Sequence, residues 1–226
     1  MSRFLNYYIA ISTFYLLLFL FGQDDFAWYF KPFLMPFLIL ATYKFSFFST
    51  KKWLLLALIF SWIGDVLLMF SSKEELYFIL GLVFFLMAHV LFILLFTQQK
   101  KEEQYVKRWD FWLGIVATLA YFCFMLTLLF PKLGDLKIPV SIYAFAVSLM
   151  LATAVKGYFS WQKPMNSLIL IGALFFVISD SFLAIDKFYN PIISANFIIM
   201  FTYIVAQYFI TEGILKLNQK NSISKS

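Results

Sequence analysis

The sequence predicts an all-α protein that crosses a membrane eight times as a polytopic helix bundle. Of its 226 residues, 63% are hydrophobic and only 13% are charged, and the mean hydropathy is +0.85. A soluble domain of this length carries far more polar surface. The apolar residues also gather in windows of about 20, which is the length of a helix that spans a bilayer. Because only short connectors separate these windows, we expect one transmembrane domain over residues 1–226.

The first four spans are expected in the first half of the chain. The first is interpreted as a retained helix, because its apolar run leads to Gln23-Asp24-Asp25 and lacks the small-residue box of a cleaved signal. The second opens with Lys31-Pro32, the third carries Asp65, and the fourth carries His89. Their expected ranges are 4–21, 28–43, 53–70 and 76–96.

The last four spans follow a charged connector that runs from about residue 98 to 108. The fifth and sixth spans are apolar windows, the seventh carries Asp180, and the eighth carries a polar stripe that includes Gln207. Their expected ranges are 111–130, 138–155, 167–185 and 192–214. The polar residues 216–226 are expected to form a short, frayed cytoplasmic tail.

The distribution of basic residues predicts the orientation. Most of the 18 Lys and Arg residues lie at the two ends of the chain and in the loops after the second, fourth and sixth spans. The positive-inside rule therefore places both termini in the cytoplasm. We expect an integral protein of the bacterial inner (plasma) membrane. The net charge of +6 is explained by this loop bias, so membrane lipids are the expected partners, without nucleic acid or a protein partner.

Two aspartates within the spans are the candidate catalytic residues, Asp65 and Asp180. A charged side chain at the bilayer centre costs roughly 2.5–3.5 kcal/mol, so such residues are functional by default. A purely structural alternative remains open for each. Asp65 would then form a salt bridge with Lys31. Asp180 would accept a hydrogen bond from Tyr203, Gln207 or Ser179.

Five further residues are candidates for substrate binding or for supporting the aspartates: Lys31, His89, Tyr143, Tyr203 and Gln207. The topology places Lys31 and Tyr143 in the same outer half of the membrane as both aspartates. Tyr203 and Gln207 share one face of the eighth span because they are four residues apart. Simpler alternatives stay open, since Lys31 can snorkel to the interface, His89 can serve helix packing, and polar stripes often mark helix contacts.

Metal-dependent and nucleophilic chemistries find little support in the sequence. One His and one Cys exclude a three-His zinc centre, and no metal or other cofactor is expected. A Gly-Xaa-Ser-Xaa-Gly elbow is absent from the sequence, and so is a Gly-rich phosphate loop. The sequences around Asp65 and Asp180 echo each other at a spacing of half the chain. This echo suggests a parallel four-plus-four repeat, with chance as an equal alternative.

Two carboxyl groups in one cavity of low dielectric constant suit acid-catalysed cleavage. One carboxyl donates a proton while the other stays ionised, as in enzymes that pass through an oxocarbenium ion. We therefore expect the two groups within about 10 Å of each other. The alternative function is a lipid or small-molecule transporter or translocase with an intramembrane Asp/Lys site.

The order of short motifs resembles that of the YhhN-like integral membrane proteins, the lysoplasmalogenase family. The motifs are Lys31-Pro32 with Met35-Pro36, Gly64-Asp65-Val66-Leu67-Leu68, Gly81-Leu82 with Phe85 and Ala88-His89, Gly172-Ala173-Leu174-Phe175, Ser179-Asp180-Ser181-Phe182-Leu183-Ala184, and Tyr203 with Ala206-Gln207. This resemblance implies hydrolysis of the vinyl ether bond of a lysoplasmalogen to a fatty aldehyde and glycerophosphocholine or glycerophosphoethanolamine. It also implies a metal-free reaction that depends on Asp65 and Asp180. Of these, we expect Asp65 to be the ionised partner and Asp180 the acid.

Overall fold

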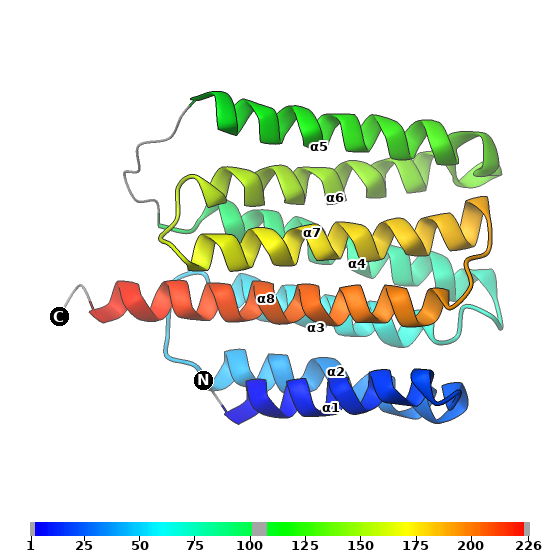
Figure 1. Ribbon diagram of the computed structural model, residues 1–226, viewed down its shortest axis with the longest axis horizontal. Helices are drawn as coiled ribbons and strands as arrows, with labels where there is room; N and C mark the ends of the chain where they lie inside the picture. The colour runs from blue at the N-terminus through cyan, green and yellow to red at the C-terminus, as the bar shows by residue number, and fades with distance from the viewer. Residues whose placement is uncertain (1–2, 101–107, 224–226) are drawn as a thin grey trace. The chain divides into compact units, whose positions relative to one another are not determined.

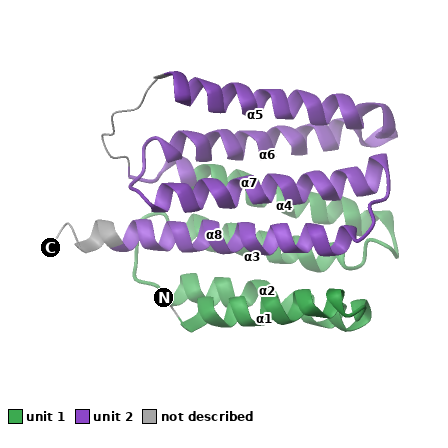
Figure 2. Ribbon diagram, in the orientation of Figure 1, with its two compact units in different colours: residues 1–95 green, residues 96–226 purple. Residues whose placement is uncertain are grey.

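The computed structural model describes residues 3–100 and 108–223, and in these ranges the chain is helical with short connections. It forms two compact units, residues 1–95 and residues 96–226 (Figure 2). The protein is an all-α, polytopic integral membrane protein, as the sequence predicts. Whether the two units act as one transmembrane domain stays a prediction.

The first unit is built from four helices: α1 (Arg3–Leu20), α2 (Asp24–Lys44), α3 (Lys51–Leu68) and α4 (Glu75–Thr97), whose last residues pass into the second unit (Figure 1). Helices α1 and α2 pack together, and so do α2 and α3. Helices α3 and α4 approach closely at a pair of glycines. A Cβ atom at Gly64 would lie 2.7 Å from the Phe85 ring, and one at Gly81 would lie 2.7 Å from Leu68. Small residues are the usual means of bringing membrane helices this close.

The second unit holds α5 (Arg108–Leu129), α6 (Lys137–Tyr158), α7 (Met165–Ala184) and α8 (Ala195–Ile223), which run side by side in this order (Figure 1). Two short 3₁₀ turns, Phe130–Lys132 and Gly134–Leu136, join α5 to α6. Helices α7 and α8 pack with backbone close to backbone. A Cβ atom at Gly172 would lie 2.8 Å from the Ile210 nitrogen and 2.9 Å from the Ala206 oxygen.

The eight expected helices are all present in the described part of the chain. Six of them, α1 and α4 to α8, are long and apolar enough to cross a membrane. The other two, α2 and α3, have 21 and 18 residues and carry more charged residues, among them Lys31 and Asp65. Candidate site residues therefore lie both on these two more charged helices and on four of the six apolar ones.

The helix ends differ from the expected ones at three places. Helix α2 begins at Asp24 because two aspartates in its first turn interact favourably with the helix dipole. Helix α7 continues as a π-helical turn, Ile185–Tyr189. Helix α8 continues to Ile223, beyond the expected end at 214, and residues 224–226 of the expected tail lie outside the described residues. The charged connector over 101–107 lies outside the described residues.

Candidate functional site

Asp65 lies in the last turn of α3 and is 4% exposed. Its neighbour Gly64 lets α3 approach α4 at this level, which places the carboxyl in a closely packed part of the first unit. The Lys31 ammonium on α2 interacts electrostatically with Asp65. That Lys31 sets the charge of Asp65 stays a prediction.

Two phenols of α1 lie within electrostatic range of Asp65. Tyr8 and Tyr15 are 1% and 2% exposed, and both interact electrostatically with the Asp65 carboxyl. They are seven residues apart, which is two helical turns, so they project from one face of α1. We call Tyr8, Tyr15, Lys31 and Asp65 the Asp65 cluster. Sequence reasoning missed the two tyrosines, because tyrosine near the end of a membrane helix is usual at the bilayer interface.

His89 is fully buried in α4. It follows Gly81 and Phe85 at intervals of four residues, so it continues the helix face that packs against Gly64 of α3. The structure thus places this candidate in the interior of the first unit, in the helix that packs beside Asp65.

Asp180 lies in the last turn of α7 and is 8% exposed. The hydroxyl group of Tyr143, near the start of α6, donates a hydrogen bond to its Oδ2 at 2.9 Å. Tyr143 was expected from the sequence to lie at the same depth as Asp180. The structure shows that the two side chains form a hydrogen bond. The sequence-based alternatives for the Asp180 partner named Tyr203, Gln207 and Ser179, and did not include Tyr143.

A second tyrosine reaches the residue after Asp180. The Tyr121 hydroxyl of α5 lies 2.7 Å from the Ser181 Oγ. We call Tyr121, Tyr143, Asp180 and Ser181 the Asp180 cluster. Its surroundings are apolar, because Tyr121 also packs against a group of buried side chains that includes Met125 and Leu129. The π-helical turn of α7 begins five residues after Asp180 and borders the same apolar group through Ile185.

The polar stripe of α8 lies against α7, one to two helical turns from Asp180. The Ser179 hydroxyl donates to the Ile199 carbonyl oxygen at 3.0 Å, and the Tyr203 ring packs edge-on against the Phe176 ring at a centroid distance of 5.6 Å. Gln207 is fully buried, and within the described residues its side-chain amide has no hydrogen-bond partner. Buried amides are rarely left unpaired, so Gln207 stays a candidate for binding a polar group.

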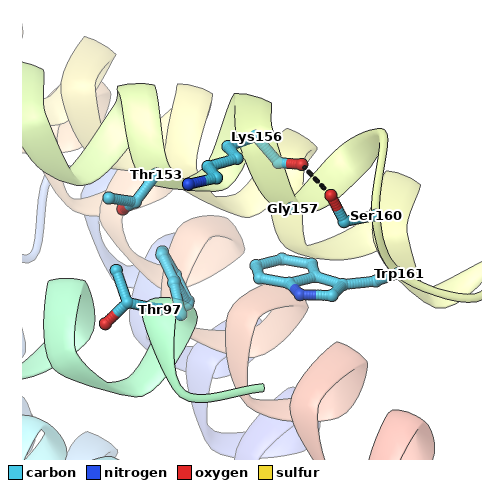
Figure 3. A pocket seen from close by; sticks show the side chains of 7 residues that line it. Thr97, Thr153, Lys156, Gly157, Ser160 and Trp161 are labelled. Carbon is cyan, nitrogen blue, oxygen red and sulfur yellow. Dashed lines mark hydrogen bonds between the residues drawn. The ribbon is translucent and has the colours of Figure 1, made fainter. Parts of the chain in front are cut away.

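Figure 3 shows a separate pocket in the second unit, lined by the ends of α4 and α6 and by Trp161. Its volume is about 40 Å³, far below the several hundred that a lipid-sized ligand needs. Lys156 in this pocket has a structural explanation. It lies in the last turn of α6, where a cation interacts favourably with the helix dipole. Because Lys156 follows Tyr143 by 13 residues, this pocket is about 20 Å along the helix from the Asp180 cluster. We do not assign it to the candidate site.

Each cluster can perform part of an acid–base reaction. Both present a buried carboxyl group next to phenol hydroxyls, and the Asp65 cluster adds an ammonium group. A nearby cation favours a negative charge on a carboxyl. Asp65 belongs to the first unit and Asp180 to the second, and the expected separation of about 10 Å between them stays a prediction.

Comparisons with known proteins point to one family. The sequence model described as the YhhN family matches residues 26–214. Among curated proteins, the chain is 30% identical to Homo sapiens lysoplasmalogenase TMEM86A over 161 residues, covering 68% of this chain and 61% of that protein. It is 31% identical to Homo sapiens lysoplasmalogenase TMEM86B over 162 residues, covering 71% and 62%.

A bacterial relative gives the same result. The chain is 30% identical to the lysoplasmalogenase of Mycobacterium tuberculosis over 171 residues, covering 72% of this chain and 60% of that protein. The chain thus matches about 60% of the length of these curated relatives. No solved structure matches it.

Proposed function

The chain belongs to the YhhN family, and we propose that it is a membrane hydrolase that cleaves the vinyl ether bond of lysoplasmalogens. The products are a fatty aldehyde and glycerophosphocholine or glycerophosphoethanolamine. The similarity to relatives named lysoplasmalogenase supports the reaction class. The observation that carries the proposal for this chain is that each of two membrane helices holds a buried carboxyl beside hydroxyl groups.

The two clusters have different chemical roles in this proposal. Lys31 favours the ionised form of Asp65, so Asp65 is the base. Asp180 is assigned the role of the acid, and Tyr143 holds its carboxyl through Oδ2. A hydrogen bond to one oxygen fixes the orientation of the carboxyl and thus the direction in which the proton leaves.

The reaction begins when Asp180 transfers its proton to the vinyl carbon that is not bonded to oxygen. The adjacent carbon becomes an oxocarbenium ion, which the Asp65 carboxylate stabilises. Water adds to this carbon as Asp65 accepts one of its protons, which yields a hemiacetal. The hemiacetal then breaks its bond to the glycerol oxygen, which takes the proton that Asp65 had accepted, while Asp180 accepts the proton of the hemiacetal hydroxyl, so both carboxyl groups return to their starting states. One water is consumed, and one aldehyde and one glycerol hydroxyl are formed.

The experiment measures release of fatty aldehyde from a lysoplasmalogen by the purified protein in lipid vesicles. The Asp65→Asn and Asp180→Asn variants are expected to lose almost all activity, because Asn neither donates nor accepts the required proton. The matched control is Asp186→Asn. The Asp186 Oδ1 accepts a hydrogen bond from the Ile192 nitrogen at 2.8 Å, which an amide oxygen can also do.

A substrate control separates this mechanism from other hydrolases. The saturated alkyl ether analogue has no vinyl carbon to protonate, so it should remain intact. Aldehyde release that persists in both aspartate variants would remove the proposed mechanism. Movement of the lipid across the vesicle membrane without any product would instead support a translocase.

A further inference from the structure

Two tryptophan side chains bond α2 to α3 on either side of the Lys31–Asp65 pair. The Trp62 indole nitrogen of α3 donates to the Pro32 carbonyl oxygen of α2 at 2.7 Å. The Trp28 indole nitrogen of α2 donates in the opposite direction, to the Met69 carbonyl oxygen at the end of α3, at 3.3 Å. The Trp28 ring also packs edge-on against the Phe70 ring at a centroid distance of 5.6 Å.

The stronger of these bonds depends on a proline. In a regular helix the Pro32 carbonyl would accept a hydrogen bond from the nitrogen of residue 36. That residue is Pro36, which has no N–H to donate. The Pro32 carbonyl oxygen is therefore released from the helix, and inside a membrane it needs another donor. Trp62 supplies this donor from the neighbouring helix.

The positions of these contacts put Lys31 opposite Asp65. Lys31 precedes Pro32 directly and lies between the two contact points on α2. Asp65 follows Trp62 by three residues, which is close to one helical turn, and lies between the two contact points on α3. The two electrostatically coupled groups are thus bracketed along both helices by interhelical hydrogen bonds.

We infer that Trp62, through its bond to the Pro32 carbonyl, is a positioning residue that sets the distance between the Lys31 ammonium and the Asp65 carboxylate. Trp28 supports the same alignment through its bond at the end of α3. The inference rests on the proposed function for its consequence in catalysis, but the alignment itself is a property of the first unit. The hydrogen bond from Trp62 to Pro32 thus affects the charge of Asp65 indirectly, through the position of Lys31.

The test compares the wild-type protein with Trp62→Phe, which removes the donor and keeps an aromatic ring. The readout is the infrared carboxyl absorption of Asp65, assigned by its loss in Asp65→Asn. We expect Trp62→Phe to shift the ratio of protonated to ionised Asp65. In a Lys31→Met background the same substitution should have no further effect, because the cation that Trp62 positions is gone.

Turnover gives a second measurement. We expect kcat for aldehyde release to fall roughly two- to tenfold in Trp62→Phe, as for the loss of one hydrogen bond, and to be unaffected by Trp62→Phe when Lys31 is already Met. The matched control is Trp109→Phe, because the Trp109 side chain is 78% exposed. An unchanged Asp65 absorption in Trp62→Phe, or an equal shift with and without Lys31, would overturn the inference.

Two further designs keep the test decisive. If Trp62→Phe does not fold, Pro36→Ala approaches the same bond from the other helix, because the restored N–H competes with the indole for the Pro32 carbonyl. It should then shift the Asp65 absorption in the same direction. If the wild-type protein releases no aldehyde, the proposed function fails, and the infrared comparison alone still decides whether Trp62 positions Lys31.

Discussion

The Tyr143 hydroxyl donates to Oδ2 of Asp180 across the interface between α6 and α7, at 2.9 Å. Both residues are buried, and they come from opposite ends of their helices, near the start of α6 and in the last turn of α7. A hydrogen bond to a buried carboxyl has little competition from water, so it constrains the side chain strongly. The orientation of the proposed acid therefore depends on a residue 37 positions away in the chain.

Tyr143→Phe should reduce aldehyde release roughly two- to tenfold, the range expected for the loss of one hydrogen bond to an uncharged carboxyl group. The ring keeps its volume, so the protein should fold and the loss should lie in kcat. The measurement is steady-state turnover of a lysoplasmalogen in lipid vesicles, with thermal unfolding recorded for the same preparation.

Tyr121→Phe is the matched control for this variant. It removes a phenol hydroxyl from the same cluster, but this one contacts the Ser181 Oγ and not the Asp180 carboxyl. Its effect on turnover should be clearly smaller than that of Tyr143→Phe. Equal losses in the two variants would mean that the hydroxyls matter for packing and not for the orientation of Asp180.

Gly172→Ala should destabilise the second unit more than Gly64→Ala destabilises the first. The added methyl group at Gly172 meets backbone atoms of Ile210 and Ala206, which cannot yield unless the helices separate. At Gly64 its two nearest contacts are atoms of the Phe85 ring, a side chain, and the nearest backbone atom, the Gly81 oxygen, is 3.3 Å away. We expect a cost of about 1–3 kcal/mol at Gly172, measured as a lower Tm in detergent.

A compensating substitution checks the cause at Gly64. Phe85→Leu removes ring atoms from the contact, so the Gly64→Ala, Phe85→Leu double variant should recover part of the lost Tm. If Gly64→Ala lowers Tm more than Gly172→Ala, the distinction between backbone and side-chain contacts does not govern stability here.

The orientation of the chain can be tested with reporter fusions at Ser226 and after Lys132. The positive-inside rule and eight crossings together predict a cytoplasmic C-terminus and an external loop after α5. An enzyme such as alkaline phosphatase, active only outside the cytoplasm, should be active after Lys132 and inactive at Ser226. Equal activity at both sites would place them on the same side of the membrane. It would contradict the three crossings that are expected between them.

Hydropathy predicted the helices well, because the energy of burial in lipid is summed over about 20 residues and tolerates single polar positions. The helix ends depend on local bonds that hydropathy does not measure. Helix α8 extends past 214 because Lys216 pairs with Glu212 at 2.8 Å and Asn218 donates to the Gln99 Oε1 at 3.0 Å. The second of these contacts joins residues 119 positions apart, so it becomes visible only once the helices are placed.

Some residues of the candidate site could be predicted from the sequence, and others could not. Asp65 and Asp180 stand out in the sequence because a carboxyl inside a span is costly. Tyr143 was proposed from its expected depth, and the structure gives it a hydrogen bond to Asp180. Tyr8 and Tyr15 gave no signal, because a buried tyrosine looks the same in sequence as one at the bilayer interface. The bond from Trp62 to Pro32 was likewise hidden, since Pro36 implies a released carbonyl but does not identify its donor.

The phenols of α1 provide the last prediction. Tyr8→Phe and Tyr15→Phe remove hydroxyl dipoles within electrostatic range of Asp65 while the rings stay packed, for Tyr15 edge-on against Phe19 at a centroid distance of 5.2 Å. Each variant should lower kcat for aldehyde release roughly two- to tenfold, because a polar group near the proposed base is lost from a site without bulk water. Tyr7→Phe is the matched control, since Tyr7 is on the same helix and is 53% exposed. Turnover that falls as much in Tyr7→Phe as in the buried variants would mean that α1 serves only to insert and pack the protein.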